Sequence, residues 1–329
     1  WLIRLEGDGG PPYSGPTWHV STSGSDDNDG SADSPFATIQ HGIDASSDGD
    51  TVLVAAGTYY ENINYNEKNI VVTGLDRNET HIDGNETGMV VTINNATGNS
   101  SLMNFTIQNG GNPEINDGSG IYCDNCNTTL TTLNIAHNNP THGGAGSAVL
   151  ADNGNITING GTQIYSNSGA SGAIGFRNTN AIIDDIRVES NLTDGPSAGI
   201  YITNYSTVEI NNATITNNNE IGIYVYDGSE VDITNSNINN NSGSGIYAGS
   251  DVSSVDISYS IISNNGGNAG IDLVGIPANI SNVLIANNNG TQAGGIHCSG
   301  DDNNEYDVTV TITNSSIINN SSSNSLGDG

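Results

Sequence analysis

Three nearly identical segments fill the stretch from Ala198 to Asn265. The triplet Gly-Ile-Tyr begins at Gly199, at Gly222 and again at Gly245, so the repeat is 23 residues long. Each triplet is followed by an apolar–acidic–Ile motif: Val208-Glu209-Ile210, Val231-Asp232-Ile233 and Val255-Asp256-Ile257. A fixed period between 20 and 50 residues is typical of repeat proteins.

Apolar residues alternate with polar ones inside each repeat. Ile223 and Val225 point to one side of the expected strand and Tyr224 to the other. A period of two predicts strands with one buried face, and Gly, Asn, Asp and Ser between them suit turns. A unit this small buries its apolar face only by stacking on its neighbours. The sequence therefore predicts an all-β fold, a single three-sheet parallel β-helix whose coils rise about 4.8 Å each.

The pattern extends in both directions, from Gly120-Ile121-Tyr122 to Ile317-Ile318-Asn319-Asn320, and predicts about ten to eleven coils. A pair of asparagines recurs before the loops, at 138–139, 217–218, 264–265 and 287–288. Asparagines stacked at one turn can hydrogen-bond along a column and satisfy their buried amides. We therefore expect an asparagine ladder inside the solenoid.

The net charge of −31, with only five Lys and Arg among 329 residues, restricts the partners. Nucleic-acid binding needs many cations to neutralise phosphates, which excludes it, and anionic membranes are disfavoured for the same reason. A strongly acidic surface suits an extracellular or cell-surface protein in salty water or with bound Ca²⁺. The charge also keeps a β protein soluble, and this alone can explain it.

Three cysteines are present, and the sequence has no run long and apolar enough to span a membrane. Cys123 and Cys126 form a C-x-x-C without a second pair for zinc, which leaves a local disulfide or two free thiols. Cys298 occupies the same place in its repeat as Cys123, about seven coils away. At about 4.8 Å per coil this is far beyond disulfide reach.

The N-terminal region differs from the repeats and divides the chain into three parts. Residues 1–18 form an apolar arm and a Gly/Pro linker, residues 19–50 a capping segment, and residues 51–329 the β-helix. In the capping segment, Asp33 or Ser34 should begin a helix that runs to Ala45, with Pro35 in its first turn. This helix would cover the open end of the solenoid.

The run from His19 to Asn62 resembles the opening of right-handed parallel β-helix proteins of the pectin-lyase-like superfamily. The similarity lies in Ser-Gly-Ser-Asp-Asp-Asn-Asp-Gly, Ser-Pro-Phe-Ala-Thr-Ile-Gln, Gly-Asp-Thr-Val-Leu-Val and Ala-Gly-Thr-Tyr-Tyr-Glu-Asn. It is closest to secreted bacterial β-helix proteins of unknown function and to the pectate lyases of family nine. The resemblance implies a right-handed solenoid and an extracellular location, but the superfamily includes lyases, hydrolases, adhesins and structural proteins.

One turn near the N-terminus carries four neighbouring oxygen donors, Asp26, Asp27, Asn28 and Asp29, followed by Gly30. Hard oxygen ligands close together suit a structural Ca²⁺ ion, although the spacing of an EF-hand is missing. A polar turn capped by its own side chains explains the same residues.

Two columns of side chains should face outward from the central repeats. The tyrosines Tyr201, Tyr224 and Tyr247 could hold a glycan or a partner protein, or could simply stiffen the sheet as a cross-strand ladder. The second column holds one carboxylate per coil, at Glu209, Asp232 and Asp256. Their mutual repulsion should be relieved by cations or by raised pKa values.

A polysaccharide lyase would need a base and a cation beside a uronate carboxylate. The resemblance implies a Lys on a central coil, whereas Lys68 is the only Lys and lies beside the first coil. The candidate lyase site is therefore Arg177 and Arg187 with Asp184 and Asp185, where a surface ion pair is the alternative explanation. For a hydrolase, Asp184-Asp185 and Asp301-Asp302 are candidates by residue type alone.

The leading hypothesis is an extracellular structural or adhesive β-solenoid, and its alternative is a Ca²⁺-dependent polysaccharide lyase or another glycan-binding or glycan-degrading β-helix enzyme. No cap follows Asn320, so the last coil should present free strand edges. The apolar residues of the N-terminal arm, Trp1, Leu2, Ile3 and Leu5, could add a strand to the last coil of the next molecule. Such head-to-tail contacts build a filament.

Overall fold

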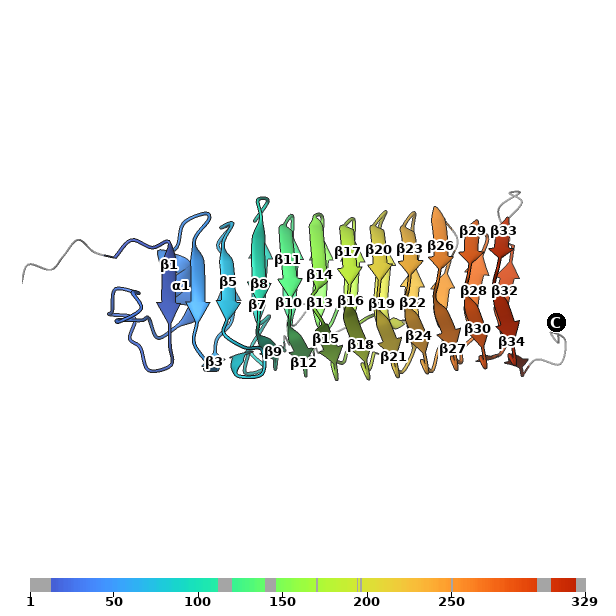
Figure 1. Cartoon of the computed structure of the whole chain (residues 1–329), viewed down its shortest axis with the longest axis horizontal. Helices are drawn as coiled ribbons and strands as arrows, with labels where there is room; N and C mark the ends of the chain where they lie inside the picture. Colours follow the sequence, from blue (N-terminus) through green and yellow to red (C-terminus); the bar gives the residue numbers. More distant parts are fainter. Residues whose placement is uncertain are drawn as a thin grey trace, which may run out of the picture.

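The computed structural model describes residues 13–111, 120–139, 146–169, 171–193, 195, 197–249, 251–300 and 309–323, apart from the side chains of residues 197 and 198. These residues form one long solenoid of short parallel strands, with a helix at the N-terminal end (Figure 1). Every strand pairs with its counterpart in the next coil, and the pairs are parallel throughout. The predicted three-sheet parallel β-helix is therefore confirmed.

Three sheets of 12, 11 and 10 strands form the faces of the solenoid. The 12-stranded sheet contains β1 (Thr17–Val20), β2 (Thr51–Val54), β5 (Val71–Gly74), β8 (Ser100–Met103), β11 (Asn127–Thr131), β14 (Asn155–Asn159), β17 (Asn180–Asp184), β20 (Thr207–Asn211), β23 (Glu230–Thr234), β26 (Ser254–Ser258), β29 (Ala278–Ser281) and β33 (Val310–Thr313). The 11-stranded sheet contains β3 (Gly57–Tyr60), β6 (Thr80–Asp83), β9 (Thr106–Gln108), β12 (Asn134–Ala136), β15 (Thr162–Tyr165), β18 (Ile186–Glu189), β21 (Thr214–Thr216), β24 (Asn237–Asn239), β27 (Ile261–Ser263), β30 (Leu284–Ala286) and β34 (Ser316–Ile318). The 10-stranded sheet contains β4 (Ile63–Asn64), β7 (Val91–Asn94), β10 (Ile121–Asp124), β13 (Val149–Asp152), β16 (Ile174–Arg177), β19 (Ser197–Thr203), β22 (Ile221–Val225), β25 (Ile246–Ala248), β28 (Ile271–Val274) and β32 (Ile296–Ser299). A short extra pair joins β31 (Asn289–Gly290) to β35 (Ser321–Ser322). The expected ten to eleven coils are close to this arrangement, but no single count fits all three faces.

The core is a set of aliphatic columns that run along the solenoid axis. In the 12-stranded sheet, one inward column stacks Leu130, Ile158, Ile183 and Ile210 in direct register. All four side chains are buried. Because the same position points inward in every coil, the alternation within one repeat is enough to build a continuous apolar core.

Asparagines form a second internal column, as the sequence predicts. Its members are Asn138, Asn167, Asn191, Asn218, Asn241, Asn265, Asn288 and Asn320. The side-chain amides of the first seven each donate to the side-chain oxygen of the next asparagine at 2.9–3.1 Å. The residue before many of these asparagines has a positive φ, for example 56° at Asn217 and 54° at Asn240. Asn tolerates this conformation, which explains the recurring pair.

The helix α1 (Ile39–Ala45) covers the N-terminal end, but it is shorter than expected. Thr38 is its N-cap, rather than Asp33 or Ser34. The residues before it are extended because Phe36 exchanges backbone hydrogen bonds with β1, donating to His19 and accepting from Ser21. The predicted apolar face of the cap is nevertheless correct, since Phe36, Ile39 and Ile43 are all buried.

The strand β1 begins at Thr17 and pairs with β2, so the last two residues of the expected linker belong to the 12-stranded sheet. The arm residues Trp1, Leu2, Ile3 and Leu5 lie outside the described residues. Cys123 and Cys126 form a disulfide, the first of the two alternatives that the sequence left open. Within the described part of the chain, no helix has the length and apolar character needed to cross a membrane.

Candidate functional site

The outer face of the 10-stranded sheet carries the tyrosine column. The repeat register places Tyr201, Tyr224 and Tyr247 on consecutive strands. Neighbouring ring centroids are 5.4 and 4.8 Å apart, and the ring planes differ by only 19° and 21°. The three rings therefore cover one another's faces and present mainly edges and hydroxyl groups to the outside.

Packing also sets the chemistry of these phenols. Burial, followed by the neighbouring Tyr247 and Tyr201, raises the pKa of Tyr224 to about 12. The hydroxyl group of Tyr224 therefore stays protonated at neutral pH and can donate a hydrogen bond. A fourth ring, Tyr226, lies 6.3 Å from Tyr224 and is tilted by 44°. A role of the predicted tyrosines in glycan or partner binding stays a prediction.

The column continues beyond the tyrosines into a His–Asp pair that the sequence analysis missed. Tyr247 is followed in register by Asp272 and then by His297. The imidazole Nδ1 of His297 lies 2.7 Å from one oxygen of Asp272, and the amide of Asn268 donates to the other oxygen at 2.8 Å. Asp272 is only 1% exposed. Continuing the Gly-Ile-Tyr alignment would have found this pair, because Gly270-Ile271-Asp272 and Gly295-Ile296-His297 take the same place in later repeats.

Arg177, one of the candidate lyase residues, lies on β16 of the same sheet. This strand is next to the one that carries Tyr201 and four strands from the one that carries Asp272. Its Nε donates to Asp152 Oδ1 at 2.6 Å and its Nη2 to Asp152 Oδ2 at 2.5 Å. Tyr122 donates to the same carboxylate at 3.3 Å. Burial, followed by the charge of Asp152, raises the pKa of Tyr122 to about 12. This cluster is a closed network in which the arginine is already neutralised by a two-point contact.

The other candidate lyase residues lie elsewhere. Arg187 points outward from the 11-stranded sheet, where it pairs with Glu189 at 2.5 Å. Asp184 accepts hydrogen bonds from Asn211 and Asn212, and Asp185 occupies the turn before β18 with a φ of 55°. The structure therefore does not bring Arg177 and Arg187 together, because ten residues of chain carry them to different faces of the solenoid.

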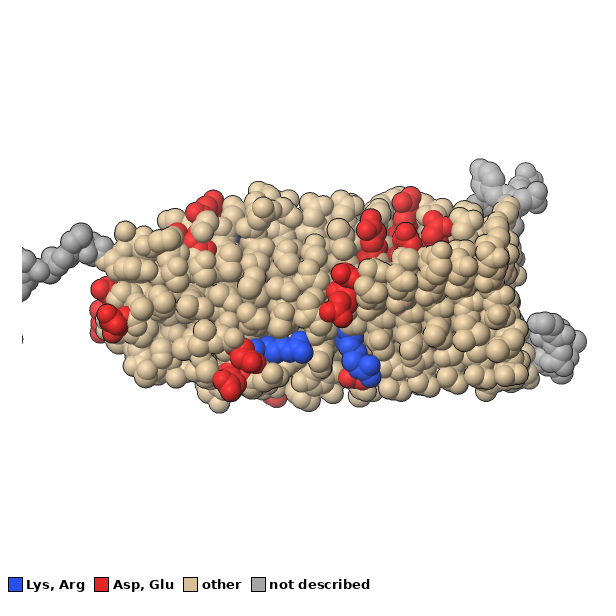
Figure 2. Space-filling view, in the orientation of Figure 1, with Lys and Arg blue, Asp and Glu red and all other residues tan. Residues whose placement is uncertain are grey.

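The acidic column lies on the 12-stranded sheet, with Glu209, Asp232 and Asp256 in direct register. Figure 2 shows acidic side chains in a row over β20, β23 and β26. Burial raises the pKa of Asp232, and the charges of Asp256 and Glu209 raise it further. The three residues also line a hollow of about 140 Å³ together with Thr207, Glu230 and Ser254.

The predicted calcium turn is held by its own hydrogen bonds. Both oxygens of Asp26 accept hydrogen bonds, Oδ1 from the backbone of Ala37 and Thr38 and Oδ2 from the Thr38 hydroxyl. Asn28 donates its amide to the carbonyl of Pro35 at 2.8 Å.

Asp29 accepts from the backbone and hydroxyl of Ser31, and Asp27 is exposed. Donors thus occupy both carboxylate oxygens of Asp26 and one of Asp29, where a Ca²⁺ ion would compete with them. Nowhere in the described ranges do three or more His, Cys, Asp or Glu side chains lie close enough to hold a metal. Calcium binding stays a prediction.

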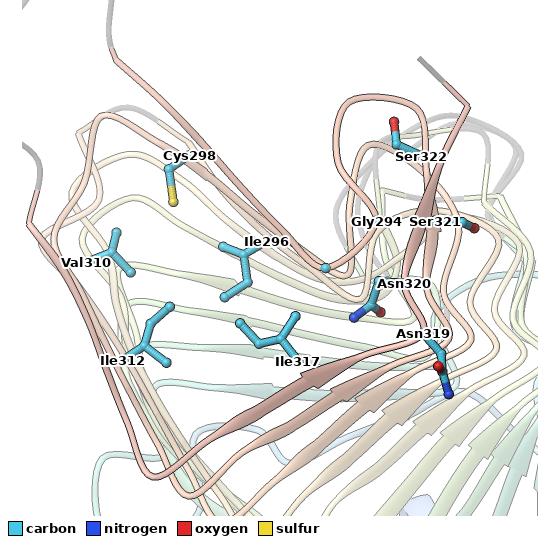
Figure 3. Close-up of a pocket in the computed structure, with 11 residues that line it drawn as sticks. Gly294, Ile296, Cys298, Val310, Ile312, Ile317, Asn319, Asn320, Ser321 and Ser322 are labelled. Atoms are coloured by element: carbon cyan, nitrogen blue, oxygen red, sulfur yellow. The ribbon is translucent and has the colours of Figure 1, made fainter. Parts of the chain in front are cut away.

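The C-terminal end of the solenoid holds a cavity of about 660 Å³. Figure 3 shows Ile296, Val310, Ile312 and Ile317 pointing into it, with Cys298 at one side. These side chains belong to the last described coil, and Ile312 and Ile317 are 44% and 47% exposed. The inward position of Cys298 agrees with the predicted repeat alignment, since it is seven strands from Cys123 in the same column.

Comparisons with solved structures agree with this architecture. The catalytic domain of a GH87 α-1,3-glucanase matches with a TM-score of 0.63 and 16% identity, over 93% of this chain and 60% of that one. A GH136 lacto-N-biosidase from Eubacterium ramulus matches with a TM-score of 0.52 and 11% identity, over 92% and 68% of the two chains. The A-module of the mannuronan C-5 epimerase AlgE4 from Azotobacter vinelandii matches with a TM-score of 0.53 and 14% identity, over 86% and 91%. At these identities the similarity establishes the fold.

The sequence comparisons identify the family. The uncharacterized protein YwoF of Bacillus subtilis is 33% identical over an alignment of 76 residues, and the match covers 18% of this chain and 16% of that protein. The model of the family described as "Right handed beta helix region" matches residues 119–289 and 172–327. Together these matches span residues 119–327, which is 209 of the 329 residues. The chain therefore belongs to the right-handed β-helix family.

Proposed function

We propose that this protein is an extracellular polysaccharide-binding β-helix that contacts its glycan through the tyrosine corner, which consists of Tyr201, Tyr205, Tyr224, Tyr226 and Tyr247. The observation that carries the proposal is that four of these rings, from three consecutive coils, contact one another, while Tyr205 lies on Gly228 in the turn after β19. Aromatic rings with a polar tip suit sugars, which offer both apolar faces and hydroxyl groups. The similarity in fold to proteins whose names specify glycans supports the same class of ligand.

An extracellular location is part of this proposal. The Cys123–Cys126 disulfide supports it because disulfides persist in oxidising compartments. The net charge of −31 also suits a protein that must stay soluble outside the cell.

Affinity electrophoresis through gels that contain soluble polysaccharides tests glycan binding. The wild-type protein should be retarded by at least one polysaccharide, and the Tyr224→Ala variant should be retarded less. Tyr60→Ala is the matched control, because Tyr60 is 72% exposed but lies on β3, on another sheet. Equal migration of all three proteins in every gel would contradict the proposal.

Cleavage of the glycan is a second candidate, and the acidic column on the 12-stranded sheet favours it. Glycosidases use a carboxylic acid of raised pKa beside an ionised carboxylate, and Asp232 lies between Glu209 and Asp256 in this way. A lyase has less support, because the arginines proposed for it are occupied by Asp152 and Glu189. New reducing ends that vanish in Asp232→Asn would support hydrolysis, whereas an unsaturated, ultraviolet-absorbing product that is lost in Arg187→Ala would support a lyase.

Assembly into a structural or adhesive filament is a third candidate, and the cavity at the C-terminal end favours it. Its lining carries no charge, on a protein whose surface otherwise repels copies of itself. It combines apolar side chains, among them Ile312 and Ile317, with polar ones such as Asn320. The apolar arm of a second copy, Trp1 to Leu5, has the composition to fill this end by strand addition.

Electron microscopy of the full chain and of a variant lacking residues 1–6 tests this role. Filaments that form only with the arm would support strand donation. Filaments that persist without the arm would eliminate that role, and a wild-type protein that stays monomeric at high concentration would eliminate assembly.

A further inference from the structure

Two tyrosines at the edge of the 10-stranded sheet are exposed although each ring is seated on the protein. Tyr205 is 74% exposed and Tyr226 is 39% exposed. Both lie in the turns that lead from the 10-stranded to the 12-stranded sheet, after β19 and β22. These two residues are not part of the outward column that the sequence predicts.

Each ring rests on a glycine in the next coil. A Cβ atom added to Gly228 would lie 2.3 Å from Cδ1 and 2.4 Å from Cε1 of Tyr205. A Cβ added to Gly249 would lie 2.6 Å from Cδ2 of Tyr226. Real atoms do not approach so closely, so the rings occupy space that only glycine leaves open. The backbone thus supports one side of each ring and leaves the rest accessible.

One of the two supported rings, Tyr226, contacts the stacked column, and the other lies close to it along the chain. Gly228, which supports Tyr205, is only two residues after Tyr226. Tyr226 in turn contacts the column through Tyr224, at 6.3 Å between ring centroids. Tyr226 therefore extends the aromatic column, and Tyr205 lies exposed on the glycine two residues after Tyr226.

The charges around this surface disfavour an acidic ligand. Every basic side chain in the described part of the chain already has a partner. Arg77 donates to the carbonyl of Gly161 and Lys68 to three backbone carbonyls, while Arg177 and Arg187 pair with Asp152 and Glu189.

Carboxylates are close by. Asp227 follows Tyr226 directly, and Glu230 lies three residues after Asp227, at the start of β23. The backbone N–H of Tyr205 donates to the carbonyl of Asp227 at 2.8 Å, which fixes this acidic residue beside the first ring as well. A polyuronate would meet repulsion here without a free cation to offset it.

We infer that Tyr205 and Tyr226 form a platform for the pyranose rings of a neutral polysaccharide. The apolar face of a neutral sugar can lie on an exposed aromatic ring, and the rigid backing of Gly228 and Gly249 holds each ring in place without a loss of side-chain freedom on binding. This inference rests on the proposed glycan-binding function and narrows it to neutral glycans and to two further residues.

The test compares neutral probes (dextran, pullulan and galactomannan) with acidic probes (polygalacturonate and alginate) by affinity electrophoresis at low and high NaCl. The wild type should bind at least one neutral probe, and the affinity should change little with salt. The Tyr205→Ala/Tyr226→Ala variant should lose at least about tenfold in affinity for that probe, which corresponds to about 1.4 kcal/mol. The Tyr60→Ala/Tyr259→Ala variant is the matched control, since both of its rings are exposed elsewhere.

Further variants separate binding from folding. Tyr205→Phe and Tyr226→Phe keep the rings and should keep most of the affinity, whereas Gly249→Ala should weaken binding by displacing Tyr226. Circular dichroism and thermal melts show whether each variant is folded.

The outcomes distinguish this inference from the proposed function. If the wild type binds only the acidic probes, or if the double alanine variant binds neutral probes as well as the wild type does, the platform is wrong although glycan binding stands. If the wild type binds no probe of either class, both fail.

Discussion

Single asparagines hold the turns of this solenoid, and Asn218 shows how. Its side-chain oxygen accepts from both the backbone and the amide of Asn191, while its own amide donates to Asn241 and to the carbonyl of Val188. The residue is 1% exposed. Water cannot replace these bonds, so each donor left without a partner costs about 1–3 kcal/mol.

Asn218→Ala should therefore lower the free energy of unfolding by about 2–4 kcal/mol, since it strands at least two buried donors of Asn191. Chemical denaturation followed by circular dichroism measures the change. Asn237→Ala is the control, because Asn237 is exposed on β24, and it should cost no more than about 0.5 kcal/mol. Equal effects of the two variants would show that the ladder is not stabilising.

Asp232 lies between two other carboxylates, Glu209 and Asp256, and their mutual repulsion lowers the stability of the folded protein. Its pKa lies above the usual value of 3.8 because of burial and then because of Asp256 and Glu209. The folded protein therefore holds this proton more tightly than the unfolded chain does. By linkage, the contribution of Asp232 to stability is most favourable at low pH and falls as the pH rises through its folded-state pKa.

Asp232→Asn should stabilise the protein at pH 7 by about 0.5–1 kcal/mol, a small value because solvent screens this exposed side chain. The advantage should shrink as the pH falls towards 3.8, the usual pKa of Asp. Thermal melts of both proteins across this pH range measure it, with Glu86→Gln on an exposed turn as the control. An advantage that does not change with pH would rule out charge repulsion as its cause.

The N-terminal cap is the element that depends most on charged side chains. At the start of α1, the two oxygens of Glu61 accept the backbone N–H groups of Ile39 and Gln40, both at 2.9 Å. At its end, Nζ of Lys68 donates to the carbonyls of Ile43, Asp44 and Ser46 at 2.7–2.9 Å. Both residues come from the first coil, so they fasten the short helix to the solenoid and satisfy its end groups.

Lys68→Met should loosen the cap, because three carbonyls lose a charged donor and hydrogen bonds to charged groups contribute about 1.5–3 kcal/mol. Hydrogen exchange should become faster in α1 and β1 and stay unchanged in the central coils, for example in β23. Glu86→Gln again provides the control. Protection of α1 equal to that of the wild type would contradict this role for Lys68.

At the scale of the whole molecule, acidic side chains far outnumber basic ones. The chain has 36 Asp and Glu but 5 Lys and Arg, and carboxylates stack one coil apart on the 12-stranded sheet. Figure 2 shows how few basic side chains interrupt one face. Self-repulsion of this kind destabilises a compact state and is weakened by salt, whose screening length falls from about 10 Å at 0.1 M to about 3 Å at 1 M.

The melting temperature should therefore rise when NaCl is increased from about 0.1 to about 1 M. Melts in excess EDTA, and in CaCl₂ at matched ionic strength, separate screening from specific binding. If calcium is bound, EDTA should lower the melting temperature at every NaCl concentration. A melt that EDTA leaves unchanged would remove calcium from the description of the protein, and a melt that NaCl leaves unchanged would remove self-repulsion.

The sequence by itself determined the architecture, because alternation and a repeated unit are local properties that every coil shares. The tyrosine column could be placed from the 23-residue period, and the acidic column from the alignment of the repeated motifs. The recurring Asn pairs predicted the ladder but not all of its members, because the ladder asparagines are 23 to 32 residues apart. Only the tertiary structure decided which residues become neighbours where the length of the repeat changes. Arg177 and Arg187, only ten residues apart, lie on different sheets and face different sides.

The rim of the tyrosine corner shows the physical reason. Whether Tyr205 can lie on the surface depends on a missing side chain at Gly228, one coil away, and the length of the intervening turns sets which residues meet there. The start of the helix also depends on a contact between distant residues. The pairing of Phe36 with β1 overrode the local preference for a helix start at Asp33 or Ser34. Contacts between coils depend on register, which a single repeat does not contain.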